Sequence, residues 1–254
     1  NEAAQRNWKE ILFNRRMLTC IFLGFTSGMP LYVLFQLVPA WLRSSGVDLS
    51  TIGLFALVSL PYTWKFLWSP LMDRYKPPFL GRRRGWTLIT QLGLLATIGL
   101  LGHFDPGESL QAIVWLVFAV ALFSASQDIV IDAYRRELLA DDELGTGTSI
   151  FINAYRLSSL VPGSLSLILS DLLPWSTVYW VTAAFMAVGI ATTLAIRETS
   201  DDALAPRSLR EAVIDPFREF FARDGIATGL AILAFMFLYK LGDNMATALA
   251  TPFY

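Results

Sequence analysis

Seven mostly apolar stretches, each about 20 residues or longer, restrict this chain to folds that cross a membrane. The sequence of 254 residues is 54% hydrophobic and 16% charged, whereas a soluble protein carries about 25% charged residues. Backbone in lipid must satisfy its own hydrogen bonds, and runs this apolar exclude the alternating strands of a barrel. The sequence therefore predicts an all-α membrane protein. The stretches are residues 17–42, 51–72, 86–104, 110–132, 146–170, 178–196 and 226–254.

The Lys and Arg residues between these stretches set the expected orientation. Sixteen of the 20 lie in the N-terminal segment and in the connections 73–85, 133–145 and 197–225. The opposite connections carry Arg43 alone, and the other three cations lie inside apolar stretches. Because cytoplasmic loops are enriched in Lys and Arg, we expect a multi-pass protein with a cytoplasmic N-terminus. The first stretch is too long for the core of a cleaved signal peptide, so we expect it to be retained.

The connection 197–225 is the longest and most polar, and it divides the chain. Ser208 and Glu211 have the spacing of a capping box, which predicts a short amphipathic helix on the cytoplasmic interface. We expect a six-helix bundle over residues 1–196, then this connector, and then the first helix of an incomplete second bundle over residues 226–254. A long connector after six spans favours a two-fold repeat.

Ionisable side chains inside the apolar stretches are the main functional signal. Lys65 lies in the second stretch, Arg156 in the fifth and Asp128 near the end of the fourth. Lys240 and Asp243 both lie in the seventh. Such a group costs about 2.5–3.5 kcal/mol at the centre of a membrane helix, so it usually faces a polar cavity or a partner. The pattern indicates a protein that handles a polar solute within the bilayer.

The cations have structural as well as functional interpretations. Lys65 is either an interfacial anchor beside Trp64 and Trp68 or an ammonium group that binds carboxylates in a cavity. Arg156 keeps its charge, so it needs a counter-charge or an anionic ligand. Asp128 is the nearest candidate counter-charge in the sequence. Both interpretations stay open for each residue.

The acids leave similar alternatives. Asp128 and Asp132 are four residues apart and share one helix face. Asp132 lies near the cytoplasmic end, which favours a solvated position, whereas Asp128 is either a proton carrier or half of a structural ion pair. Lys240 and Asp243 are three residues apart, so they either pair with each other or form a couple that opens when substrate arrives.

The sequence lacks the residues that several functional classes require. Cys20 is the only cysteine and His103 the only histidine, so a disulfide within the chain and a Cys- or His-based zinc site are excluded. No Gly-rich phosphate loop with Lys and Ser or Thr occurs, which argues against a nucleotide-driven pump. We expect no metal, no cofactor and no nucleic-acid partner.

The loop after the second stretch carries a resemblance to a known family. It contains Asp73-Arg74 and, after the added residues 75–80, Gly81-Arg82-Arg83-Arg84. This pattern resembles the Asp-Arg…Gly-Arg-Arg-Arg signature of the major facilitator superfamily, although the added residues lengthen its spacing. In that superfamily the signature locks two halves together on the cytoplasmic side. The gating residues that the resemblance implies, with Asp132 at the nearby helix end, are Asp73, Arg74, Arg82, Arg83 and Asp132.

Further stretches narrow the resemblance. They are residues 65–75, 124–134 and 239–243, with 208–213 in the connector. Together they resemble the AmpG-type muropeptide permeases, which are inner-membrane transporters of Gram-negative bacteria with a twelve-helix core. The resemblance covers nearly the whole chain, as a six-helix half plus one helix. It implies proton-coupled import of anhydro-muropeptides for cell-wall recycling, by alternating access.

The import that the resemblance implies gives each polar residue inside the apolar stretches an expected role. Protons, an anhydro-muropeptide and the lipid bilayer are the expected partners of a monomer that needs a C-terminal half. The expected location is the bacterial inner membrane. The expected substrate-binding residues are Tyr32, Gln36, Lys65, Tyr155, Arg156 and Lys240, and the proton-coupling residues are Asp128 and Asp243.

Other functions remain open at this point. The acetyl-CoA transporters of eukaryotic endomembranes share the Lys-x-Leu-Trp and Gln-Asp-Ile patterns, so a carrier of acetyl-CoA or another anionic metabolite is one alternative. An intramembrane enzyme acting on lipid-linked sugars is another, because paired acids at depth can do acid–base chemistry. A membrane sensor that binds without transporting is a third. We expect a transporter and not an enzyme.

Overall fold

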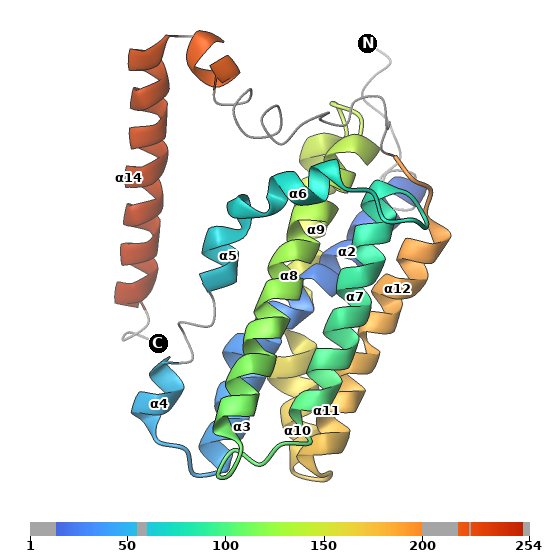
Figure 1. The fold of residues 1–254 in the computed structure, drawn as a ribbon, viewed down its shortest axis with the longest axis vertical. Coiled ribbons are helices and arrows are strands. Elements are labelled where there is room, and N and C mark those ends of the chain that lie inside the picture. Colours follow the sequence, from blue (N-terminus) through green and yellow to red (C-terminus); the bar gives the residue numbers. More distant parts are fainter. Residues whose placement is uncertain (1–13, 55–59, 200–217, 224, 251–254) are drawn as a thin grey trace. The chain divides into compact units, whose positions relative to one another are not determined.

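The computed structural model describes residues 14–54, 60–199, 218–223 and 225–250, with the backbone alone for 53–54, 237 and 240–250. These residues form helices and no strands (Figure 1), which agrees with the expected all-α class. The chain divides into two compact units, Asn1–Leu204 and Ala205–Tyr254. The amphipathic helix expected after Ser208 lies outside the described residues.

The first unit contains both long and short helices. They are α2 (Arg15–Tyr32), η1 (Val33–Leu37), α3 (Val38–Ser44), α4 (Leu49–Leu54), α5 (Leu60–Trp64), η3 (Lys65–Leu67), α6 (Ser69–Arg74), α7 (Arg82–Leu101), α8 (Leu110–Leu138), α9 (Leu144–Leu157), η4 (Val161–Leu165), α10 (Ser166–Ser170), α11 (Trp175–Ala184) and α12 (Met186–Ala195). In the second unit, residues 218–223 are helical and α14 runs over Ile226–Ala250.

Within the described residues, three helical segments are long and apolar enough to cross a membrane. They are Arg15–Ser44, Leu110–Leu138 and Trp175–Ala195, and they match the first, fourth and sixth apolar stretches of the sequence. The third stretch corresponds to α7, which begins earlier than expected and carries three arginines in its first turn. The second and fifth stretches are each divided into shorter helices.

Prolines explain where these two stretches are divided. Pro70 at the start of α6 has no backbone N–H to continue a helix from η3. Pro162 likewise cannot donate to the carbonyl of Ser158, which accepts from the amide of Val161 at 3.1 Å instead. The result is a turn after α9 followed by η4, which is π-helical. Lys65 therefore lies at a break and not inside a continuous helix.

Small residues bring α2 and α9 together. Gly24 and Gly28 are four residues apart, the spacing of a close helix–helix contact in membranes. A Cβ at Gly24 would lie 2.5 Å from the backbone oxygen of Phe151, and one at Gly28 would meet the backbone oxygen of Tyr155. The two backbones therefore touch without side chains between them.

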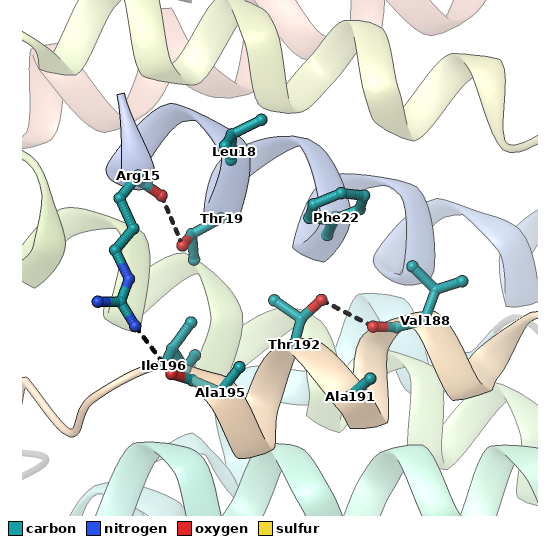
Figure 2. Close-up of a pocket in the computed structure, with 9 residues that line it drawn as sticks. All are labelled: Arg15, Leu18, Thr19, Phe22, Val188, Ala191, Thr192, Ala195 and Ile196. Carbon is teal, nitrogen blue, oxygen red and sulfur yellow. Dashed lines mark hydrogen bonds between the residues drawn. The ribbon is translucent and has the colours of Figure 1, made fainter. Parts of the chain in front are cut away.

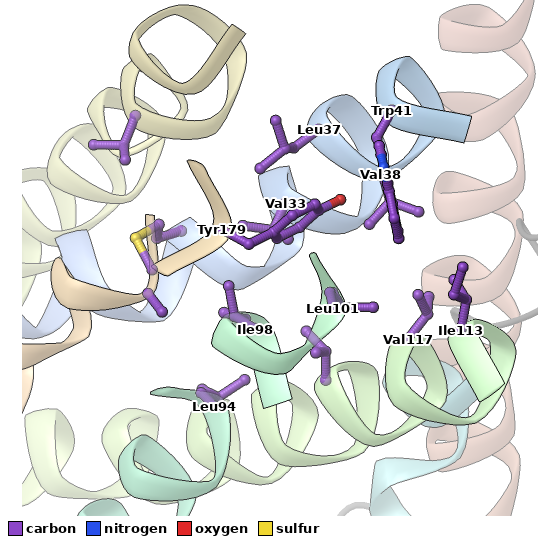
Figure 3. Packing of buried hydrophobic residues seen from close by; sticks show 14 of the residues in the cluster. Val33, Leu37, Val38, Trp41, Leu94, Ile98, Leu101, Ile113, Val117 and Tyr179 are labelled. Atoms are coloured by element: carbon purple, nitrogen blue, oxygen red, sulfur yellow. The ribbon is translucent and has the colours of Figure 1, made fainter. Parts of the chain in front are cut away.

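Two apolar clusters fill the first unit at different depths. One contains Val33, Leu37 and Trp41 with Tyr179, and Figure 3 shows these side chains facing Ile98 and Val117 from other helices. The other cluster contains Met17, Cys20 and Leu23 from α2 with Ile131 and Tyr134 from α8. The part of α2 and α8 between the two clusters is polar, and it contains the candidate site.

A polar layer as candidate functional site

The polar layer consists of neighbouring residues on α2 and α8. Thr26 and Ser27 of α2 are buried, as are Ser124, Ser126 and Gln127 of α8. Ser27 Oγ donates to Asp128 Oδ1 at 2.5 Å, and Gln127 Nε2 donates to the backbone oxygen of Thr26 at 3.1 Å. Asp128 is thus held by a short hydrogen bond from the adjacent helix.

The broken second stretch lies against this layer. Trp68 Nε1 donates to Ser126 Oγ at 3.0 Å, and α5 and η3 contact α8. Lys65 is half-buried and close enough to Asp128 to interact with it electrostatically. The sequence-predicted residues Lys65 and Asp128 are therefore brought to the same place.

Some buried polar atoms of the layer are left without partners. Tyr62 Oη, Ser124 Oγ and Gln127 Oε1 make no hydrogen bond within the part of the chain that the structure describes. Tyr62 Oη approaches Ser124 without the geometry of a full hydrogen bond. Since buried polar groups are nearly always paired, such atoms are typical of a place where water or a polar solute binds.

Aromatic and amide groups extend the layer toward the π-helical segments. The rings of Tyr32 and Tyr155 meet edge to face with their centroids 6.1 Å apart. A Cβ on Gly163 would collide with the side-chain amide of Gln36, so that amide lies directly against η4. π-Helical turns inside α-helices are rare and frequent at functional sites. Three of the expected substrate-binding residues thus belong to one region of the first unit.

The partner considered for Arg156 is not found. Arg156 is exposed on α9, and within the described residues no ion pair joins it to Asp128. Asp128 is engaged by Ser27 instead. Lys240 and Asp243 fall on α14, where the structure describes the backbone alone, so their expected pairing lies outside the described side chains.

A second polar cluster joins helix ends at the arginine-rich loop. Arg83 Nη1 bonds to Asp73 Oδ1 at 2.6 Å, and Arg83 Nη2 bonds to Glu137 Oε1 at 2.8 Å. The Arg83 side chain is only 10% exposed, so both ion pairs are largely shielded from solvent. Arg82 Nη1 also donates to the backbone oxygen of Asp73 at 3.1 Å. Three of the expected gating residues thus bind α6, α7 and α8 together.

The start of α7 is capped from a distant part of the chain. Glu198 accepts hydrogen bonds from the backbone amides of Arg83 and Arg84 at 3.1 and 3.0 Å. Gly81, whose φ is 89°, lets Glu198 come this close, because a Cβ there would lie 2.5 Å from a carboxylate oxygen. A carboxylate at a helix N-terminus is stabilised by unpaired amides and by the helix dipole. The segment after α12 is thereby fixed to α7.

The other two expected gating residues lie outside this cluster. The guanidinium of Arg74 lies 5.6 Å from the ring centre of Tyr75. Asp132 is exposed and pairs with Arg135 on its own helix at 3.0 Å. Asp132 is thus exposed, and whether it faces solvent stays a prediction.

Several residues of the polar layer and of the cluster around Arg83 could not be identified from the sequence. No motif marks Ser27, Tyr62, Glu137 or Glu198. Two of these residues bind a partner that is distant in the sequence, because Arg83 lies 54 residues from Glu137 and 115 residues from Glu198. The Gly24–Gly28 spacing was a visible signal for close packing of α2. It did not reveal which polar side chain between the glycines would meet Asp128.

The sequence matches a known protein family and several of its relatives. The model of the Major Facilitator Superfamily matches residues 20–254. An uncharacterised protein of Haemophilus influenzae is 47% identical over 244 residues, which cover 95% of this chain and 57% of that protein. The anhydromuropeptide permease of Escherichia coli K12 is 45% identical over 239 residues, which cover 94% of this chain and 48% of the permease.

A less similar relative is also named as a transporter. A Rickettsia felis protein named as an AmpG transporter is 30% identical over 255 residues, covering 96% of this chain and 61% of the relative. The chain thus spans 48% to 61% of the length of these relatives. The resemblance and the fold class expected from the sequence are confirmed. The family match over residues 20–254, together with helices of membrane-spanning length, shows that this chain belongs to the major facilitator superfamily.

Proposed function

We propose that the protein imports anhydro-muropeptides across the bacterial inner membrane together with protons, by alternating access. The observation that carries the proposal is Asp128, an acid within an apolar helix that Ser27 holds in a layer of polar side chains. The identity of 45% with a protein named anhydromuropeptide permease supports the substrate. The cation-rich loops support a cytoplasmic N-terminus.

The chemical groups of a muropeptide are complementary to the proposed substrate-binding side chains. A muropeptide presents peptide carboxylates, which suit Lys65 and Arg156 of the first unit and Lys240 of α14. Its sugar hydroxyls suit the phenols of Tyr32 and Tyr155 and the amide of Gln36, which lie in one region of the first unit. Charged groups at membrane depth in transporters usually serve a substrate or proton pathway.

Proton coupling is assigned to the acids of the membrane helices. Asp128 accepts from Ser27 while ionised and can give up that hydrogen bond when it takes a proton. Because Lys65 interacts with Asp128 electrostatically, protonation of Asp128 frees the Lys65 ammonium to bind a substrate carboxylate. Asp243 on α14 is the second candidate carrier. Proton binding and substrate binding then favour each other.

The cluster around Arg83 gives the first unit a rigid cytoplasmic end. Asp73, Arg83 and Glu137 join three helices, and Glu198 attaches the end of the unit to α7. Alternating access in facilitators requires a bundle that rocks as one body. We therefore assign Arg82 and Arg83 with Asp73 to gating, and we keep Arg74 of α6 and Asp132 of α8 as further gating residues.

The two aspartates of α8, Asp128 and Asp132, are expected to differ in their effect on transport. Asp128→Asn is expected to reduce uptake of radiolabelled anhydro-muropeptide into proteoliposomes at least ten-fold and to abolish its dependence on an imposed proton gradient. Asp132→Asn is the matched control, since Asp132 lies one turn further along the helix and is exposed. That variant is expected to keep its gradient dependence, whatever its rate of uptake, because Asp132 is proposed for gating and not for proton transfer.

Two outcomes contradict the proposal in different ways. Undiminished uptake by Asp128→Asn that an uncoupler still abolishes would remove Asp128 as the proton carrier. Stronger competition by CoA esters than by unlabelled muropeptide would favour a carrier of anionic cofactors instead.

A further inference from the structure

An apolar groove runs between α2 and α12, away from the polar layer. It has a volume of about 400 Å³, and Leu18, Phe22, Val188 and Ala191 are among its lining residues. Figure 2 shows these side chains on two adjacent helices, with Arg15 at one end of the groove. Phe22 is 43% exposed, so the groove opens to the outside of the unit.

The polar atoms of the groove wall are already used. Thr19 Oγ1 donates to the backbone oxygen of Arg15 at 2.9 Å, and Thr192 Oγ1 donates to that of Val188 at 2.7 Å. Both hydrogen bonds stay within one helix, as Figure 2 shows. The wall therefore offers methyl and methylene groups and suits a hydrocarbon chain better than a sugar or a peptide backbone.

A cationic hollow continues the groove at its Arg15 end. It has a volume of about 330 Å³ and shares Arg15, Thr19 and Ile196 with the groove. Arg16 and Arg197 also line it, and none of its lining residues is acidic. Arg15 Nη2 donates to the backbone oxygen of Ala195 at 3.2 Å, which holds the guanidinium where the groove and the hollow meet.

Two of these three arginines form no ion pair with any residue that the structure describes. Arg16 pairs with Glu143 at 2.8 Å. Within the described residues neither Arg15 nor Arg197 forms an ion pair, and the nearby carboxylate of Glu198 binds the start of α7. Tyr134 Oη donates to the backbone oxygen of Arg197 at 2.9 Å, which fixes the backbone at that point.

We propose that the groove and the hollow form one binding site for an anionic glycerophospholipid of the cytoplasmic leaflet. One acyl chain lies along the groove between α2 and α12, and the phosphate binds Arg15 and Arg197. The site lies at the end of α2 that carries the cation-rich N-terminal segment, the side expected to face anionic headgroups. Basic pockets between membrane helices on this side are suited to anionic headgroups. The bound lipid fastens α12 to α2.

The proposal is tested by native mass spectrometry of the purified protein with lipids of matched acyl chains. Phosphatidylglycerol is expected to bind more tightly than phosphatidylcholine, and raised salt is expected to weaken that preference. Arg15→Gln and Arg197→Gln are each expected to weaken phosphatidylglycerol binding about five-fold, because a cation near the surface contributes about 1 kcal/mol. Arg43→Gln, an exposed arginine at the other end of the unit, is expected to change nothing.

A second variant tests the acyl chain. Ala191→Phe fills the groove and is expected to reduce binding of both lipids, with the preference for phosphatidylglycerol retained in what still binds. Equal binding of the two lipids by the unmodified protein would overturn the proposal, whether or not any variant folds. Competition by glycerol phosphate as strong as that by intact phosphatidylglycerol would also overturn it, because the site would then be one for a free anion.

Discussion

At the scale of single residues, the first unit depends on charges that are held by specific partners. Arg83 is the clearest example, because one guanidinium joins carboxylates from two other helices. The planar guanidinium of arginine presents its donors to both carboxylates in a fixed geometry, whereas lysine offers a compact charge at the end of a flexible stem. Removing it leaves Asp73 and Glu137 facing each other without a cation between them.

Arg83→Ala is therefore expected to lower the free energy of unfolding by about 3 kcal/mol, the lower end for a broken buried pair because the carboxylates are partly exposed. Arg83→Lys is expected to recover part of this loss. Thermal unfolding in detergent measures both, with Arg43→Ala as the control for losing a cation from the surface. Equal midpoints for Arg83→Ala and Arg43→Ala would show that the cluster does not hold the helix ends together.

Sequence reasoning located the charged residues better than their partners. Lys65 and Asp128 were recognisable because ionisable groups are rare in apolar stretches. Asp128 belongs to the polar layer, and Lys65 lies near enough to interact with it electrostatically. Ser27 and Glu198 were not recognisable, since serine and glutamate are common and their roles arise only when distant helices pack. The same reason explains why Asp128 was matched with Arg156 and is bound by Ser27 instead.

At the scale of helices, sequence hydropathy identified the apolar stretches but not their breaks. The stretches 51–72 and 146–170 were expected as single spans, and each is divided near a proline. A hydropathy window averages over such breaks, because proline changes the backbone hydrogen bonds without making the segment polar. The unbroken helix α8 was foreseen, although it extends to Leu138.

The contact of α2 with α9 gives a prediction at this scale. Gly28→Ala places a Cβ against the backbone oxygen of Tyr155 and 2.6 Å from Ser158 Oγ, so the two helices must separate. Overpacking of this kind costs about 1–3 kcal/mol, which thermal unfolding in detergent can measure.

Gly145→Ala is the matched control, because Gly145 lies in α9 with no atom within 4 Å of its would-be Cβ. Alanine favours helix over glycine by about 0.5–1 kcal/mol, so this variant is expected to be as stable as the parent or more so. If both variants unfold at the same temperature, the close approach of α2 and α9 contributes nothing to stability.

At the scale of the whole molecule, the proposed transport depends on which residues water can reach. The first unit places a polar layer between two apolar clusters, and the proposed transport requires that layer to open to a solute path. Arg156 is exposed on α9, so its surroundings are either that path or lipid. Asn153 is exposed three residues earlier on the same face and is not among the residues proposed to bind substrate.

A cysteine at Asn153 tests this most directly, since the chain's own Cys20 is buried and should give little background labelling. A membrane-impermeant thiol reagent is expected to label Asn153→Cys, and anhydro-muropeptide is expected to slow the labelling. A cysteine at Leu194, an exposed apolar position on α12, is expected to react slowly and without protection. Labelling of Asn153→Cys that is absent, or that proceeds equally fast with and without anhydro-muropeptide, would contradict the proposed solute path.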